Sequence, residues 1–276
     1  MSYKTILVHC DGGRNTAGRV AVAVTLAERF DAHLVGLHVR QRFEAPMFTD
    51  ATVALDALYK SYEQSVKTEE AASSAAFQGA LAGKRRSSEW RVVDGYAEDT
   101  LTAVARYADL VVLGQREPEP TPEATPTDLP ERLALHSERP ILVVPYIGAA
   151  QPPGRTVMVC WNGLREASRA VTGALPILKA AERVIVLTID AEKAGESDAG
   201  RLAGEWLGRH GVKATVQGDT AAASDVGNVI LSRAADSAAD LIVMGIYGHS
   251  RMREFVLGVA SRTLLGSMTV PLLIAH

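Results

Sequence analysis

The sequence predicts an α/β protein made of two tandem doubly wound domains, each built on a parallel five-stranded sheet. Short runs rich in Val, Ile and Leu alternate with amphipathic helical patterns along the chain, which is typical of parallel strands covered by helices on both faces. The second half of the chain also repeats the first. TILVHCDG at residues 5–12 matches TVMVCWNG at residues 156–163, an offset of 151 residues. A repeat of this length indicates duplication of one folding unit.

The repeat extends to further segments, which occur in the same order in both halves. ADLVVLG matches ADLIVMG, and RPILVVP matches VPLLIAH. The apolar runs predict strands near residues 4–10, 33–39, 89–95, 109–114 and 140–145 in the first half, and near 155–161, 183–189, 212–217, 240–245 and 271–275 in the second. Right-handed crossovers through the helices between them make each half doubly wound.

The division between the halves is predicted from the connector YIGAAQPPGR at residues 146–155, which is rich in Pro and Gly. We expect domains at residues 1–147 and 154–276. A long helix is expected over residues 51–80, where apolar residues recur at helical spacing. The last strand of each half leaves an open sheet edge. Two such edges can pair with each other, which gives a pseudo-twofold arrangement built like a dimer.

Composition excludes several classes of protein. Of the 276 residues, 47% are apolar and 22% charged, and the net charge of −3 argues against nucleic acid as a partner. No apolar run approaches the roughly 18–20 residues that span a bilayer, so no membrane association is expected. The N-terminal residues lack the pattern of a secretory signal. Two cysteines do not make a disulfide framework, which favours a cytoplasmic protein. Whether two chains form a homodimer, and which proteins are partners, stays open.

The most informative stretch is MGIYGHSRMREFVLGVASRTLL, residues 244–265, in which three glycines follow a buried strand and precede a helix. Backbone N–H groups next to glycine can approach a ligand closely, and a helix N-terminus attracts anions. The spacing Gly-x2-Gly-x9-Gly, with His249 and Arg251 between, therefore suits a di- or triphosphate. The alternative is that these glycines supply only turn and cap geometry.

These residues resemble the universal stress protein family. GIYGHSRMREFVLG preceded by LIVMG, together with VPLLIAH at the end, carries the resemblance, which extends over the whole chain as two copies. It implies a Rossmann-like fold of the adenine nucleotide alpha hydrolase type and a role in stress response. It also implies ATP with Mg²⁺ as the ligand, with adenine nucleotide as the partner and the site in the second copy. The candidate nucleotide-binding residues are Trp161, Asn162, Gly163, Ile189, Gly245, Gly248, His249, Arg251, Gly258, Val259, Ala260 and Ser261.

The second copy departs from the family pattern at two positions. Asn162 stands where the family has a carboxylate that contacts the nucleoside, and Val259 stands where a hydroxyl meets the phosphate. Each lost hydrogen bond weakens binding by about 0.5–1.5 kcal/mol. Ser261 follows closely enough to substitute as a hydroxyl donor. We therefore expect a weakened site rather than an absent one.

The first copy departs in the opposite way. Asp11 and Gly12 keep the acidic residue of the family pattern, but QREPEPTPEATPTDLPE, residues 115–131, replaces the phosphate loop. Carboxylates repel phosphate, and proline has no N–H to donate. We expect that the first copy has lost its phosphate site.

Other signals are weaker. His9, Cys10 and Cys160 lack metal-ligand spacing and are expected to pack in the core. Asp219 and Asp225 are expected at a helix start rather than on Mg²⁺. No catalytic group set is assembled, so enzymatic activity would be at most slow ATP hydrolysis. The alternatives to an ATP-binding regulatory protein are a scaffold or small-ligand-binding stress protein without nucleotide, and a weak ATP hydrolase.

Overall fold

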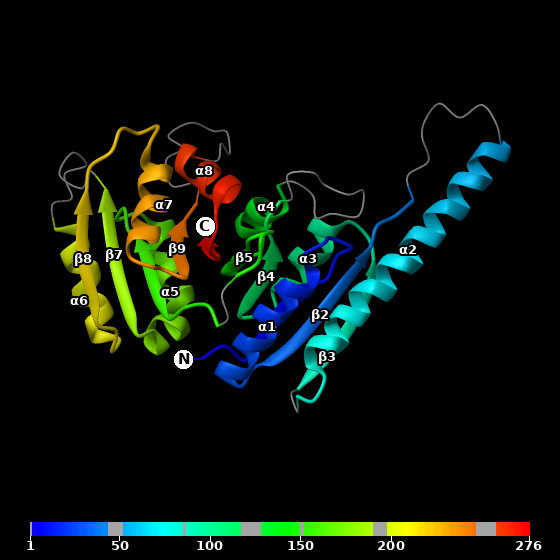
Figure 1. Ribbon diagram of the computed structural model, residues 1–276, viewed down its shortest axis with the longest axis horizontal. Coiled ribbons are helices and arrows are strands. Elements are labelled where there is room, and N and C mark those ends of the chain that lie inside the picture. Colours follow the sequence, from blue (N-terminus) through cyan, green and yellow to red (C-terminus); the bar gives the residue numbers. More distant parts are fainter. Residues whose placement is uncertain are drawn as a thin grey trace.

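The strands of both halves join in one continuous sheet, in the order β3-β2-β1-β4-β5-β10-β9-β6-β7-β8 (Figure 1). The computed structural model of the chain describes residues 2–43, 52–84, 87–116, 128–149, 152–189, 198–246 and 258–276. The strands are β1 (Thr5–His9), β2 (His33–Arg40), β3 (Ser88–Asp94), β4 (Leu110–Gly114), β5 (Ile141–Val144), β6 (Thr156–Cys160), β7 (Arg183–Ile189), β8 (Ala214–Asp219), β9 (Leu241–Gly245) and β10 (Leu272–Ala275). These positions confirm the strands predicted from the apolar runs.

Within each half the strands are parallel, and the order places the first strand beside both the second and the fourth. Strand β1 pairs with β2 on one side and β4 on the other, and β6 pairs likewise with β7 and β9. This is the doubly wound arrangement that the sequence predicts, present twice. It creates a point in each half where the strand order reverses, between β1 and β4 and between β6 and β9.

Helices cover both faces of the sheet. They are α1 (Thr16–Phe30), α2 (Thr52–Leu81), α3 (Ala97–Ala105), α4 (Leu129–His136), α5 (Arg165–Ala180), α6 (Ala199–Arg209), α7 (Val226–Asp236) and α8 (Val259–Ser267). Helices α1, α2, α5 and α6 contribute to one buried core, and α3, α4, α7 and α8 contribute to the other. Successive strand residues point to opposite faces, so Ile6 and Val8 enter the first core while Leu7 enters the second.

The two halves meet through the antiparallel pairing of β5 with β10, in which Leu142 lies opposite Leu273. This confirms the predicted pairing of the two sheet edges. Polar groups close the junction around these strands. The Tyr3 hydroxyl donates to the Gly173 carbonyl at 2.7 Å, and Gln115 Nε2 donates to the Leu265 carbonyl at 2.9 Å. Both cores run across the junction, so the halves share their hydrophobic interior.

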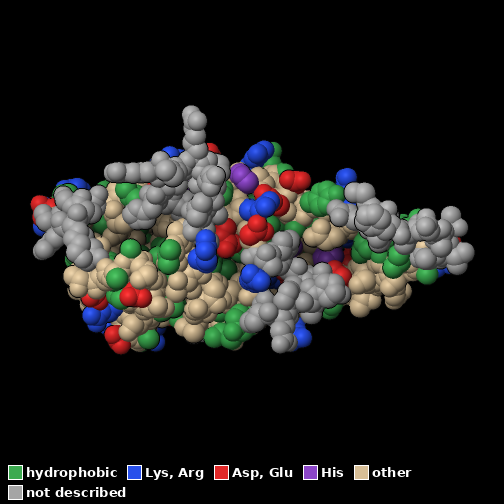
Figure 2. All heavy atoms as spheres, turned by 90° about the horizontal axis from the view of Figure 1, so that it is seen from above, with side chains coloured by type: hydrophobic (Ala, Val, Ile, Leu, Met, Phe, Trp, Pro, Cys, Tyr) green, Lys and Arg blue, Asp and Glu red, His purple; other side chains and the backbone are tan. Residues whose placement is uncertain are grey.

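The outer surface carries mixed charge. Figure 2 shows acidic and basic side chains interspersed on the described part of one face of the molecule. No helix in the described ranges has the length and apolar character that crossing a membrane requires.

Candidate functional site

In doubly wound sheets, ligands bind beyond the carboxyl ends of the strands at the point where the strand order reverses. In the second half this point lies between β6 and β9. The residues that follow β6 are Trp161, Asn162 and Gly163, and β9 ends at Gly245. Strand β7, on the other side of β6, ends at Ile189. The fold therefore gathers the candidate residues from three strand ends at one edge of the sheet.

Asn162 is the centre of the turn between β6 and α5. Its Oδ1 accepts a hydrogen bond from the Leu164 N–H at 3.1 Å, which forms an Asx turn. Gly163 within this turn has φ of 76°, a left-handed conformation that favours glycine. Both Asn162 and Gly163 are exposed. The turn thus leaves Asn162 exposed at the carboxyl end of β6, where the strand order reverses.

Gly245 is needed for packing. A Cβ at this position would run into the backbone of Glu166 and Ala167 in the first turn of α5. The missing side chain lets α5 approach the end of β9, so the glycine is explained by helix packing without any ligand. This packing role differs from the turn and cap geometry that the sequence left open as the alternative for the three glycines.

Gly258 is different. It lies immediately before α8 with φ of −58° and supplies no side-chain cap, and a Cβ there would meet nothing within 4 Å. Neither its conformation nor its neighbours among the described residues require glycine. The N–H groups in the first turn of a helix have no intrahelical partner and carry partial positive charge. Among the described residues, none lies within 4 Å of the place where a Gly258 Cβ would be, so this part of the chain leaves the start of α8 accessible to an anion.

The next residues of α8 divide between solvent and core. Val259 is 57% exposed and Ser261 only 5%. The helix is held close to α7, because a Cβ on Gly227 would lie 2.6 Å from Thr263 Cβ. The position of the α8 N-terminus is therefore fixed by packing.

Trp161 and Ile189 pack on different faces of the sheet. Trp161 packs against the core that includes α5 and α6, whereas Ile189 packs against the core that includes α7 and α8. Because α8 also belongs to the second of these faces, Ile189 shares a face with the α8 N-terminus and Trp161 does not. The contacts of Trp161 are those of a residue at the core margin.

A charged group that sequence reasoning missed lies at the same edge. Glu166 is buried in the first turn of α5 and is paired with Arg165 Nε at 2.5 Å. Burial raises the pKa of Glu166, but hydrogen bonds from Arg165 and from its own N–H outweigh this, so its pKa is lowered. Arg169 Nη1 donates to the His276 carbonyl at 2.8 Å. The signal that was available is a carboxylate three residues after Gly163, at a helix start.

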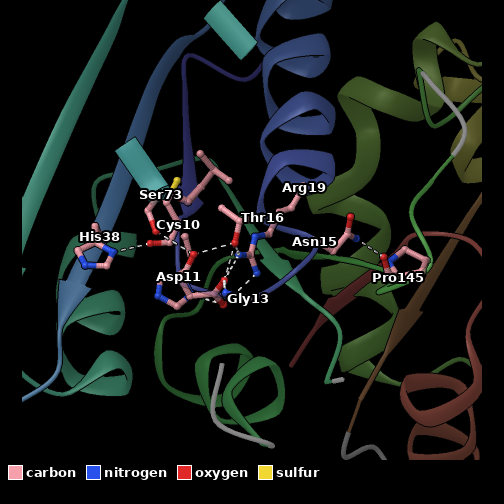
Figure 3. A network of polar contacts seen from close by, with 11 residues as sticks. Cys10, Asp11, Gly13, Asn15, Thr16, Arg19, His38, Ser73 and Pro145 are labelled. Atoms are coloured by element: carbon pink, nitrogen blue, oxygen red, sulfur yellow. Dashed lines mark hydrogen bonds and ion pairs between the residues drawn. The ribbon is translucent and has the colours of Figure 1, made fainter. Parts of the chain in front are cut away.

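The corresponding point in the first half is filled by the protein itself (Figure 3). Asp11 Oδ1 accepts hydrogen bonds from the Gly13 N–H at 3.0 Å and the Thr16 hydroxyl at 2.7 Å. The Arg19 guanidinium binds the same carboxylate, with Nη2 2.5 Å from Oδ1. Both side chains are buried, at 8% and 4% exposure. Arg19 also lies where a Cβ on Gly114 would be, so it occupies the space at the end of β4.

The groups around this ion pair are structural. His38 Nδ1 lies 2.8 Å from the Cys10 carbonyl, and the Ser73 hydroxyl donates to the Asp11 carbonyl at 2.8 Å. Burial raises the pKa of the Cys10 thiol to about 12 and lowers the pKa of His9 to about 4. No group of three or more His, Cys, Asp or Glu side chains able to hold a metal occurs in the described part of the chain.

Some of the residues singled out in the sequence lie outside the described residues, and others lie at the ends of α7 and β8. Gly248, His249 and Arg251 lie outside the described residues, as do residues 117–127 of the acidic segment. Asp225 precedes α7 as its N-cap residue, as predicted, although its side chain makes no capping hydrogen bond. Asp219 ends β8 instead, and its carboxylate is paired with Arg233 Nε at 2.5 Å.

Comparison with known proteins tests the family to which these features point. The sequence profile of the universal stress protein family matches residues 2–145 and again residues 154–276. The chain belongs to the universal stress protein family. It is a tandem member, because the family pattern occurs twice in succession. No curated protein matches the chain.

Solved structures of two-copy length share the fold of this universal stress protein. One from Archaeoglobus fulgidus DSM 4304 has a TM-score of 0.73 at 14% identity, covering 98% of this chain and 97% of that chain. A functionally unknown protein from Pseudomonas aeruginosa PAO1 has a TM-score of 0.61 at 14% identity, covering 99% and 92%. A universal stress protein in complex with cAMP matches only about half of the chain: it covers 52% of this chain and 98% of that chain at 22% identity, with a TM-score of 0.35.

Proposed function

We propose that this tandem universal stress protein binds one adenine nucleotide, with ATP as the expected ligand, in its second half and acts as a nucleotide-responsive regulatory protein. The observation that carries the proposal is the difference between the halves. In the first half Arg19 binds the Asp11 carboxylate and occupies the end of β4. In the second half Asn162 stands at the position of Asp11 and Ala170 at that of Arg19, so the buried ion pair of the first half has no counterpart at these two positions.

The described residues suit the parts of a nucleotide. The open start of α8 offers N–H groups to a phosphate, and Gly258 lets the ligand approach the backbone. The exposed Asn162 amide can donate a hydrogen bond to the nucleoside, and Ile189 offers an apolar contact on the face where α8 begins. A Mg²⁺ ion would enter with the phosphates and neutralise their charge, since Mg²⁺ in nucleotide sites takes few protein ligands.

Glu166 favours a second candidate function, a scaffold without nucleotide. Its carboxylate is buried in the turn of α5 that packs on Gly245 and has a lowered pKa, so it is ionised at neutral pH. A negative charge at this point opposes phosphate unless Arg165 or a cation compensates it. The two functions differ in whether nucleotide stabilises the fold.

The experiment is thermal denaturation with and without Mg-ATP on the parent protein, Gly258→Leu and Gly266→Leu. A ligand at a hundredfold excess over its dissociation constant stabilises the fold by about 2.7 kcal/mol. Gly266 lies in the same helix and also has open space around it, so its variant is a matched control. We expect ATP to raise the melting temperature of the parent and of Gly266→Leu, and not of Gly258→Leu.

Mass detection of nucleotide released from the purified protein complements this experiment. About one equivalent per chain is expected if the second half alone binds. No nucleotide and no ATP-dependent shift would favour the scaffold. Hydrolysis that scales with protein and disappears in Gly258→Leu would indicate a weak ATP hydrolase instead.

A further inference from the structure

A buried glutamine crosses the junction between the two halves. Gln115 directly follows β4 of the first half, and its N–H donates to the Val144 carbonyl at 2.8 Å, so it extends the sheet by one residue. Leu113, two residues earlier, enters the core to which α8 also contributes, and successive strand residues alternate between the faces of a sheet. Gln115 therefore points to the face on which α8 lies, and it is buried there.

The two ends of the Gln115 amide bond to different halves of the chain. Its Nε2 donates to the Leu265 carbonyl of α8 at 2.9 Å, and its Oε1 accepts a hydrogen bond from the Tyr146 N–H at 3.1 Å. A carbonyl only accepts and a backbone N–H only donates, so these partners fix the orientation of the amide. Leu265 lies in the last turn of α8, where the carbonyls have no partner within the helix. Gln115 thus caps the C-terminal end of α8 from the first half.

The first half also holds the other end of this connection. Tyr146 follows Pro145, whose carbonyl accepts a hydrogen bond from Asn15 Nδ2 at 2.7 Å (Figure 3). Asn15 precedes α1, in the loop that also contains Asp11. A series of hydrogen bonds and one peptide bond therefore leads from the loop that contains Asp11, through Gln115, to α8.

The equivalent position in the second half makes no such bond in return. Ile246 follows the glycine that ends β9, just as Gln115 follows the glycine that ends β4, and its N–H donates to the Ala275 carbonyl at 3.0 Å. The Ile246 side chain is buried and has neither donor nor acceptor. At this pair of positions, the polar contact therefore runs in one direction only, from the first half to a helix of the second.

We infer that Gln115 is a positioning residue for α8, through which the first half supports the phosphate end of the nucleotide site in the second half. The inference rests on the proposed function, in which the first turn of α8 receives a phosphate. Helix α8 has nine residues, and a rise of 1.5 Å per residue makes it only about 13 Å long.

The packing of α8 explains how one end of the helix affects the other. Thr263 lies near the middle of the helix and packs closely on Gly227 of α7, where a Cβ would lie 2.6 Å from Thr263 Cβ. This contact holds the middle of α8, and the bond from Gln115 holds the C-terminal end. Without that bond the helix can tilt about the contact with α7, which moves the N–H groups of its first turn away from the ligand.

The test measures Mg-ATP affinity by titration calorimetry in the parent, Gln115→Met, Gln115→Ile and Tyr3→Phe. Gln115→Met keeps the length of the side chain without its donor and acceptor. Gln115→Ile introduces the residue found at the equivalent position of the second half, where Ile246 shows that an apolar side chain fits this fold. Both Gln115 variants should bind Mg-ATP about fivefold more weakly than the parent.

Tyr3→Phe is the matched control. It removes another polar contact across the junction, the hydrogen bond from the Tyr3 hydroxyl to the Gly173 carbonyl of α5, and Tyr3 belongs to the core on the other face of the sheet from α8. The variant loses a junction contact without affecting α8. It should therefore bind Mg-ATP with the affinity of the parent.

Hydrogen exchange without nucleotide tests the position of α8 directly. The Arg262 N–H donates to the Gly258 carbonyl at 3.0 Å and so closes the first turn of the helix. This amide should exchange about tenfold faster in both Gln115 variants than in the parent. In Tyr3→Phe it should exchange at the rate of the parent.

The outcomes separate this inference from the proposed function. Parental ATP affinity in both Gln115 variants would overturn the inference, and so would equal weakening in Tyr3→Phe, because the loss would then come from the junction as a whole. A parent that does not bind ATP would instead overturn the proposed function. The exchange of the Arg262 amide would still decide the role of Gln115. An unchanged rate overturns the positioning of α8, and a faster rate in the Gln115 variants alone supports it.

Discussion

Removing Arg19 tests the claim that the first half is closed by a buried ion pair. Arg19→Met keeps the length and much of the volume of the side chain but deletes the guanidinium. Asp11 then stays buried, at 8% exposure, without its guanidinium partner, while the Thr16 hydroxyl and the Gly13 N–H still donate to its Oδ1. Breaking a buried ion pair by removing one partner costs about 3–5 kcal/mol. Because the hydrogen bonds from Thr16 and Gly13 remain, the expected loss lies at the lower end, about 3 kcal/mol.

The double variant Asp11→Asn/Arg19→Met separates charge from shape. It removes both charges and approaches the natural pair in the second half, where Asn162 keeps the same Asx turn and Ala170 is fully buried. We expect it to recover all but about 1 kcal/mol of the loss, because replacing a buried pair by neutral groups is often close to neutral.

Urea unfolding at neutral pH, followed by tryptophan fluorescence, gives the free energies of unfolding for the three proteins. The reasoning fails if Arg19→Met costs less than about 1 kcal/mol, since a buried uncompensated carboxylate must cost more. It also fails if the double variant is as unstable as the single one, because the loss would then come from packing rather than charge.

Further predictions concern pH, packing and the junction. His9 has a pKa of about 4 in the fold, lowered by burial from 6.5, so it is neutral when folded and protonates more readily when unfolded. The stability that it contributes is present above pH 6.5 and is lost as the pH falls toward 4. The free energy of unfolding should fall by about 2 kcal/mol by about pH 5. In urea titrations, His9→Cys should lack this pH-dependent loss of stability. Gly245→Ala should lower the free energy of unfolding by about 2 kcal/mol or more because its Cβ meets α5 backbone, whereas Gly258→Ala should change it by less than about 1 kcal/mol in the same titration. Tyr3→Phe should cost about 1 kcal/mol by calorimetry through loss of its bond to α5, while the 83%-exposed Tyr107 should tolerate the same change; equal effects at both tyrosines would contradict this role.

The fold was predictable because buried parallel strands leave a strong pattern. The strands β1, β4, β6 and β9 are short, mostly apolar runs, and their repetition in the same order in both halves identifies the duplication. The antiparallel pairing of β5 with β10 was predictable because a strand at a sheet edge leaves backbone N–H and C=O groups unpaired. Two such edges in one chain are stabilised by pairing with each other. A local sequence pattern was sufficient for the strands because each one is encoded within a few neighbouring residues.

The closure of the first half was not predictable in the same way. Arg19 lies in TAGRVAVAV, where one arginine in an apolar helix gives no indication that it is buried. Its role depends on Asp11 lying across the crevice and on Gly114 leaving space, contacts that arise only when β1, β4 and α1 are assembled. Glu166 escaped notice for a similar reason, because its burial depends on β9 packing under α5.

The antiparallel union of β5 with β10 has a genetic consequence. In a dimer of identical subunits, every substitution is inherited by both binding crevices, so a change that closes one closes the other. Here a peptide linker joins the copies, and each codon affects one crevice only. An arginine could thus enter α1 and shut the first crevice while the equivalent position of α5 stayed alanine. Fusion of the two copies removes the constraint of identity, so the two points of strand-order reversal can carry different residues within one chain.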